Sequence, residues 1–236
     1  MVRLISVAAG VAAAFVLSAA AANAQPIELD KSGVAALTGW LGEGRIKLNN
    51  IYTKTEGDTA TDFHEAVNGK GRTITLINAT GDDGRSWLIG GYNPQSWDSN
   101  GGFHMTPDDK ERTAFLFNLT SERIFRQTLV THILDTVGSY QTYNDEKFGP
   151  TFGLGHDLFV QEDLQAGSSV LYSYVESDGT GVNQSILDGG YTGGHITIGA
   201  MEVYSIAVVP EPGTYAMLGT GVLLLAWRVR RRQADC

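Results

Sequence analysis

Cysteine is almost missing from this chain, and its absence narrows the chemistry that the sequence can support. The only cysteine, Cys236, is the last of the 236 residues, so no disulfide can form within the chain. No spacing of residues resembles a zinc motif, a phosphate-binding loop or the Gly-x-Ser-x-Gly turn of serine hydrolases. We therefore expect no metal or other cofactor, and the sequence contains no recognisable catalytic motif.

Basic residues are also scarce, most of all between the two ends of the chain. Arg3 and the four arginines of the C-terminal tail belong to the 17 basic residues, which leaves 12 for residues 25–209. Glu211 and Asp235 are the acidic residues outside this region, so it keeps 24 of 26 and has a net charge of about −12. Binding to phosphate groups rests on Lys and Arg, and we therefore expect no nucleic-acid partner.

The first 24 residues predict a secretory signal peptide. Arg3 precedes an uncharged run from Leu4 to Ala22, and Ala22-Asn23-Ala24 supplies the small residues that signal peptidase needs for cleavage before Gln25. A retained N-terminal membrane helix is the alternative, which the alanine-rich run and the cleavage site make less favourable. The sequence thus predicts export across the inner membrane, with residues 25–208 as the exported domain.

Residues 209–236 have a different pattern in three parts. Val209-Pro210-Glu211-Pro212 comes first, and an uncharged, mostly apolar run covers residues 214–227. A basic cluster follows, formed by Arg228, Arg230, Arg231 and Arg232. The apolar run is shorter than the ~20 residues of an ordinary membrane span, and the arginines predict a cytoplasmic end. We therefore expect this segment to anchor the protein in the membrane only transiently.

This tail resembles the PEP-CTERM sorting signal of Gram-negative bacteria in the order of its three parts. The resemblance implies recognition by exosortase, a membrane enzyme that removes or transfers the tail on the way to the cell surface. A plain C-terminal membrane anchor is the alternative, because it would give the same topology without the processing.

Periodicity in residues 25–208 predicts a mainly β (α+β) domain, a two-layer antiparallel β-sandwich flanked by short helices. Helical spacing covers residues 34–41 and 58–67, with Asp30 or Ser32 as a cap for the first helix and Gly39 or Gly42 as its end. Alternation or short apolar runs predict strands at residues 44–52, 73–77, 86–92, 114–119, 124–125, 159–160, 169–175 and 196–208. Residues 93–107 are expected to form a loop, and residues 129–137 are ambiguous between strand and helix.

Five segments, in this order, resemble the TLDc domain family. They are Ile89-Gly90-Gly91-Tyr92, Ser96-Trp97-Asp98-Ser99, and residues 114–119, 148–158 and 196–204. The resemblance spans residues 46–206, departs from the eukaryotic pattern in the loops 93–106 and 178–191, and implies a β-sandwich flanked by helices. Eukaryotic members are linked to oxidative-stress protection and to the proton-pumping ATPase. Those roles do not carry over to a secreted bacterial protein, and the family offers no established catalytic residues.

Four residues are predicted as a ligand site: Trp97, Asp98, His156 and Asp157. His156 is a candidate ligand or general base, oriented by Asp157 in a glycine-rich turn. The alternative is structural: both side chains would hydrogen-bond with the loop backbone, and neighbours on a strand point to opposite faces.

Aromatic residues and a few acidic or histidine clusters are further candidates. Trp87, Tyr92, Trp97 and Phe103 are interleaved with short polar residues, as in a surface that stacks on sugar rings, although strand spacing favours Trp87 in the core. The candidates for acid–base or metal chemistry are His104 and His64-Glu65, and those for calcium are Asp82-Asp83 and Asp108-Asp109. None has the ligand spacing of a known metal motif, so solvated turns are the favoured interpretation.

These features favour an exported, non-enzymatic protein of the cell surface or extracellular matrix. Its expected partners are signal peptidase and exosortase during export, and the extracellular polysaccharide of a biofilm afterwards. The alternative is a secreted hydrolase of matrix polymers that uses His156 and Asp157 or an acidic pair. Calcium-dependent adhesion is a third, weaker hypothesis.

Overall fold

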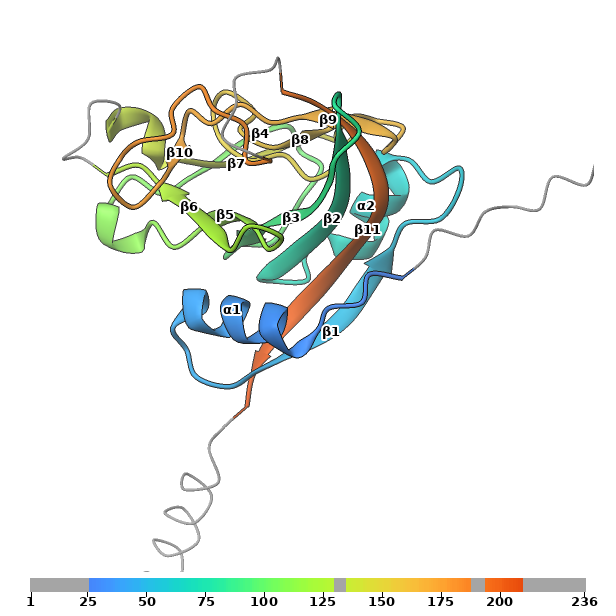
Figure 1. The fold of residues 1–236 in the computed structure, drawn as a ribbon, viewed down its shortest axis with the longest axis horizontal. Coiled ribbons are helices and arrows are strands. Elements are labelled where there is room, and N and C mark those ends of the chain that lie inside the picture. Colours follow the sequence, from blue (N-terminus) through green and yellow to red (C-terminus); the bar gives the residue numbers. More distant parts are fainter. Residues whose placement is uncertain (1–25, 130–134, 188–193, 210–236) are drawn as a thin grey trace, which may run out of the picture.

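The computed structural model describes residues 26–129, 135–187 and 194–209. The predicted signal peptide, residues 1–24, and the sorting segment beyond Val209 lie outside the described residues. Strands dominate the described part and its helices are short and few, so the predicted mainly β architecture is confirmed (Figure 1). No helix in this part of the chain is long and apolar enough to span a membrane.

One curled antiparallel sheet forms most of the fold (Figure 1). Its strands are β1 (Ile46–Thr53), β2 (Thr73–Gly81), β3 (Ser86–Asn93), β5 (Phe115–Asn118), β6 (Arg123–Gln127), β8 (Phe159–Val160), β9 (Ala166–Ser168), β10 (Tyr174–Val175) and β11 (His195–Val208). They follow the order β10-β6-β5-β3-β2-β11-β9-β8, and β1 pairs with β11 outside this path. The 14-residue β11 therefore has three neighbours and joins the two parts of the sheet.

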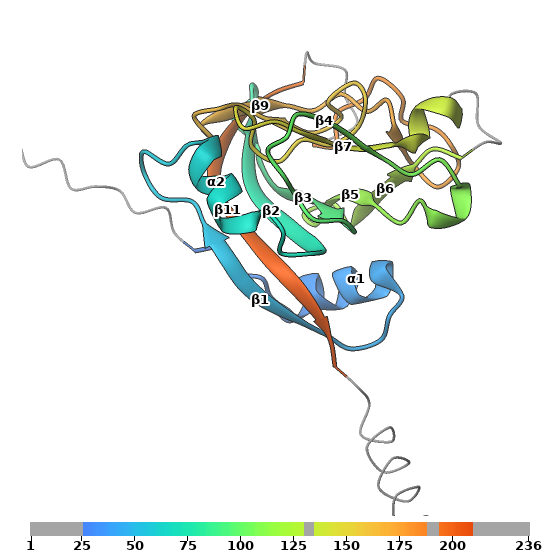
Figure 2. The ribbon, with the colours of Figure 1, turned by 180° about the vertical axis from the view of Figure 1, so that it is seen from behind.

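A loop-rich layer packs over one face of this sheet. It contains a small two-stranded sheet of β4 (Gly102–Met105) and β7 (Tyr140–Asn144), with the 3₁₀ turns η1 (Asp109–Glu111) and η2 (Asp135–Ser139) nearby in the chain. Both ribbon views place the small sheet across from β3, β5 and β6 (Figures 1 and 2). The molecule thus has two layers, of which the second is made mostly of loops.

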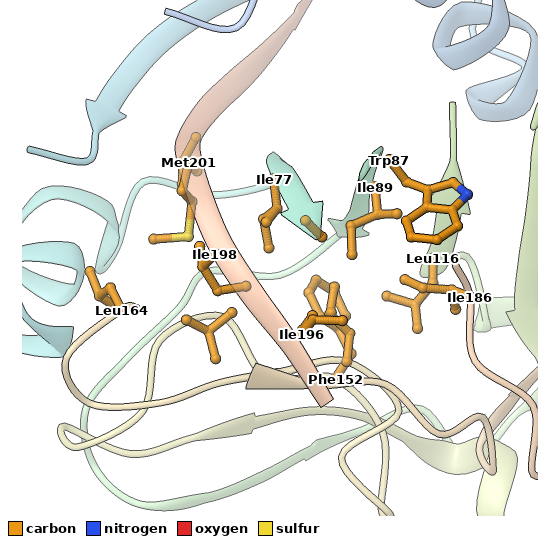
Figure 3. Close-up of a cluster of buried hydrophobic side chains, with 14 of the residues drawn as sticks. Ile77, Trp87, Ile89, Leu116, Phe152, Leu164, Ile186, Ile196, Ile198 and Met201 are labelled. Carbon is orange, nitrogen blue, oxygen red and sulfur yellow. The ribbon is translucent and has the colours of Figure 1, made fainter. Parts of the chain in front are cut away.

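Alternation along the strands divides the apolar core in two. Ile77 of β2 and Leu116 of β5 pack with Phe152 from the loop layer (Figure 3). One position earlier on β2, Leu76 belongs to the cluster on the opposite face, which α1 (Lys31–Leu41) covers. Successive strand residues point to opposite faces, so the same strands contribute to both clusters.

Both α-helices have the caps that their sequences encode. The Asp30 carboxylate accepts a backbone N–H of the first turn of α1 at 2.8 Å, and Gly42, with φ of 68°, ends this helix in the left-handed region. These caps agree with two of the predicted ones. The second helix, α2 (Ala60–Val67), begins with a capping box of Thr59 and Asp62.

The structure corrects three expectations about local structure. The predicted loop 93–107 contains β4, and the predicted strand 169–175 is irregular except for β10 at its end. The sequence predicts no strand at residues 140–144, where β7 lies. β4 and β7 form because they pair with each other across a long separation in sequence, which no local pattern reveals. The ambiguous segment 129–137 lies partly outside the described residues and overlaps η2 at its end.

Strand β11 changes its neighbour on one edge partway along its length. Its first residues pair with β9 and its later residues with β1, while β2 follows the other edge. At the change, the buried Lys54 donates from Nζ to the carbonyl oxygens of Ile198 (3.1 Å) and Gly199 (3.0 Å). The ammonium group therefore satisfies backbone acceptors that fall between the two neighbouring strands.

Replacing Lys54 with Met should leave these two carbonyl oxygens without a donor in a buried position. We expect the free energy of unfolding to fall by about 2 to 4 kcal/mol. The variant no longer bears the cost of burying an ammonium group, but the loss of its two charge-assisted hydrogen bonds outweighs this gain. Urea denaturation measures the change. The matched control is Lys47→Met on the exposed side of β1, expected to change stability by less than about 0.5 kcal/mol. Equal midpoints for the two variants would contradict this role of Lys54.

Candidate functional site

Trp97 lies in the core and not on the surface. Its side chain is 1% exposed, its Nε1 donates to Thr73 Oγ1 at 3.0 Å, and two phenylalanine rings meet it edge to face. Tyr92 and Trp87 are buried as well. Of Trp87, Tyr92, Trp97 and Phe103, only Phe103 keeps a partly exposed ring, so the four do not form a sugar-stacking surface, and Trp87 has the core position that its strand spacing favours.

Asp98 is half-exposed and closes a local turn. Its Oδ2 accepts from His104 Nε2 at 2.8 Å, and its Oδ1 accepts from the Asn100 N–H at 2.9 Å. Partial burial would raise the pKa of Asp98, but the Asn100 amide and the His104 imidazole outweigh it and lower the pKa. The structure thus pairs two candidates that the sequence treated separately.

His156 sits among aromatic rings. Its φ of 57° lies in the left-handed region, and its imidazole stacks on Phe159 with 5.3 Å between ring centroids. Tyr143 and Phe148 lie 5.5 Å and 5.8 Å from it. Burial lowers the pKa of His156, so the ring is neutral near pH 7. The imidazole therefore packs as a half-buried aromatic side chain.

Asp157 points away from this cluster and is fully buried. Its Oδ2 accepts from the backbone N–H groups of Tyr172 (2.5 Å) and Tyr174 (2.8 Å). Its Oδ1 has no hydrogen-bond partner among the described residues and faces Gly153, where a Cβ would come within 1.9 Å of it. Desolvation raises the pKa of Asp157 to about 7, because it outweighs the backbone N–H groups, which lower the pKa. His156 and Asp157 therefore have separate structural surroundings and do not form a hydrogen-bonded pair in the described structure.

Most of the remaining candidates also have structural partners, whereas Glu65 is exposed. His64 joins α2 to a loop, with Nε2 at 2.9 Å from the Asp145 carbonyl oxygen and Nδ1 at 2.8 Å from Asn68 Oδ1. Asp83 forms an ion pair with Arg85 at 2.6 Å. Over residues 26–129, 135–187 and 194–209, no three or more His, Cys, Asp and Glu side chains are grouped so that they could hold a metal ion.

A chain of half-exposed rings links the small two-stranded sheet to β8. We call it the aromatic ladder, and neighbouring ring centroids in it lie between 4.8 and 5.8 Å apart. Its members are Phe103, Tyr140, Tyr143, Phe148, His156 and Phe159. They come from β4, β7, β8 and the loop between β7 and β8, so that the pairing of β4 with β7 is needed to bring them together.

The ladder ends in an open groove of about 500 Å³. Phe148 and Phe159 supply its apolar surface, and the polar lining consists of Thr59, Lys147, Gln161, Glu162 and Asp163. Of the predicted ligand residues, only His156 contacts this region, through its ring contacts with Phe148 and Phe159. The spacing Tyr140-x-x-Tyr143 and the two phenylalanines around residues 148–159 were the available signals for this surface in the sequence.

A curled antiparallel sheet with a helix on one face and a loop-rich layer on the other defines a mainly β, two-layer domain. The TLDc domain family matches residues 40–207, well over half of the chain, and the protein belongs to this family. The PEP-CTERM protein-sorting motif matches residues 208–232. That motif implies export to the cell envelope or surface and processing by exosortase. No curated protein matches the chain.

The buried Asp157 makes a prediction about pH. Its pKa is higher in the folded state, about 7, than the ordinary 3.8, so the folded state binds more protons between these values. The contribution of this group to the free energy of unfolding is therefore fully present below about pH 4. It is lost as the pH rises towards 7, by at most about 1.4 kcal/mol per pH unit.

Asp157→Asn should remove this contribution, because the amide keeps an oxygen for the Tyr172 and Tyr174 N–H groups and does not titrate. Urea denaturation from pH 4 to 8 measures it. The difference in unfolding free energy between the two proteins should move in favour of the variant as the pH rises. Parallel pH profiles would contradict the raised pKa.

Proposed function

We propose that this protein is a non-enzymatic component of the cell surface or extracellular matrix that associates with extracellular polysaccharide. The observation that carries the proposal is the sorting motif, which begins at residue 208, where β11 ends. The Val209 N–H donates to the Arg45 carbonyl oxygen at 2.9 Å, so the folded domain continues to the residue directly before Pro210-Glu211-Pro212. The domain is therefore displayed directly next to its sorting signal.

The aromatic ladder supports association with a polymer of sugars. Half-exposed rings held edge to face by their neighbours form a rigid apolar strip, and the C–H faces of pyranose rings pack on such surfaces. The net charge of about −12 over residues 25–209 disfavours polyanions such as nucleic acid. A carbohydrate partner fits both properties.

The separate roles of His156 and Asp157 support a non-enzymatic function. A general base needs a partner that orients it, whereas His156 packs among rings and Asp157 holds backbone amides. We expect no turnover above background on a panel of polysaccharides and peptides, measured by release of reducing ends and of amines. Turnover that is abolished in His156→Ala would establish the hydrolase alternative instead.

Deleting residues 210–236 should release the protein into the growth medium, because the segment that retains it is lost. Cell fractionation and immunoblotting measure the distribution between envelope and medium. A matched control lacks only residues 234–236, which lie beyond the sorting motif, and should stay in the envelope. Intact mass of the retained protein reports whether the chain begins at Gln25. Unchanged retention of the long deletion would refute retention through the tail.

A further inference from the structure

We propose that the groove at the end of the aromatic ladder binds a pyranose unit of a neutral polysaccharide, with the sugar packed against Phe148 and Phe159 and with Lys147, Gln161 and Glu162 hydrogen-bonding its hydroxyl groups. This inference rests on the proposed function and specifies its ligand class and its binding site. The groove's volume of about 500 Å³ lies within the ~300–1,000 Å³ usual for small-molecule sites.

The groove is held open by contacts that do not depend on a ligand. The rings of Phe148 and Phe159 meet at 88° with centroids 5.0 Å apart. The Gly149 N–H donates to the Val160 carbonyl oxygen at 3.0 Å, which joins the two segments that carry these rings. On the rim, the Ala60 N–H donates to the Glu162 carbonyl oxygen at 2.7 Å and ties it to the start of α2. A preformed groove loses little entropy when a ligand binds.

Polar side chains on the rim have the chemistry that sugar hydroxyls require. A hydroxyl group both donates and accepts, and the rim offers the Gln161 amide, the Glu162 carboxylate and the Lys147 ammonium. All three are exposed, and within the described residues no hydrogen bond or ion pair occupies these side-chain groups. They are therefore available to a ligand that the phenylalanine rings position.

Charge selects a neutral polymer. The groove has one cationic side chain, Lys147, against the carboxylates of Glu162 and Asp163, and the surrounding domain is strongly acidic. A polyanionic glycan would be repelled by this field. The continuous ladder beyond the groove offers further rings to successive sugar units, which favours an extended chain over a single sugar.

Affinity electrophoresis tests the proposal with the full-length chain in detergent. Native gels contain hydroxyethyl cellulose, dextran or galactomannan as neutral probes, and polygalacturonate as the anionic probe. We expect at least one neutral probe to retard the protein, with little retardation by polygalacturonate. Phe159→Ala should weaken binding at least tenfold, and a Gln161→Ala, Glu162→Gln double variant should weaken it several-fold.

Two controls match these variants. Glu65→Gln removes an exposed carboxylate from α2, and Trp40→Ala removes a half-exposed ring from the opposite face of the sheet. Both should bind like the unmodified chain. The double variant changes only exposed side chains, so it tests the groove even if Phe159→Ala fails to fold.

The outcomes separate this inference from the proposed function. Binding of a neutral probe that the groove variants leave unchanged would overturn the groove and leave polysaccharide association intact. Stronger retardation by polygalacturonate would overturn the choice of a neutral ligand. Failure of every probe to retard the unmodified chain would overturn both the groove and the polysaccharide association, whereas retention through the tail is decided by fractionation.

Discussion

Strand β11 organises the molecule because three strands pair with it and the sorting motif follows it. Its first half holds β9, its second half holds β1, and β2 runs along the other edge. Such a change of neighbour leaves backbone carbonyls between two strands, where water is excluded and an unpaired acceptor is costly. Lys54 meets this need with two hydrogen bonds, so a single buried ammonium lets one strand serve both parts of the curled sheet.

The loop layer depends on a similar device, buried polar side chains that bond to backbone. Asp157 holds the segment before β10, and the Gln141 side chain donates to Asn93 Oδ1 at 2.8 Å. Asn118 donates to the carbonyl oxygens of Ile186 and Leu187. Loops have few ladder bonds of their own, so such side chains replace them. The result is an irregular layer that is nonetheless rigid enough to present half-exposed rings.

The burial of these polar side chains and the exposure of the aromatic rings relate the fold to the function that we propose. Asp157, which looks catalytic in the sequence, helps to build the loop layer, and His156 packs within the half-exposed aromatic ladder. A domain of this kind is suited to contact with a polymer, and the sorting motif at the end of β11 brings it to the cell envelope or surface. Strand β11 thus connects the sorting motif to the curled sheet of the folded domain.

Much of this could be predicted from sequence wherever the signal is local. The tail is recognisable by the order of Pro-Glu-Pro, apolar run and arginines. The strands β2, β3, β5 and β11 are recognisable because the residues of each alternate or are apolar over a consecutive run. The cap at Asp30 and the end at Gly42 are local as well. The sequence by itself therefore determined the sorting signal, the main strands of the sheet and the family.

Tertiary structure alone decided which polar and aromatic residues are exposed and which are buried. Trp97 and Asp157 have the residue types of a binding site, yet long-range packing buries them, and Phe103 meets Tyr140 and Tyr143 only because β4 pairs with β7. Burial and surface neighbours depend on contacts between residues far apart in the chain. Periodicity in the sequence reports only on contacts between residues that are close in the chain. For this reason the strands of the sheet could be predicted from the sequence and the aromatic ladder could not.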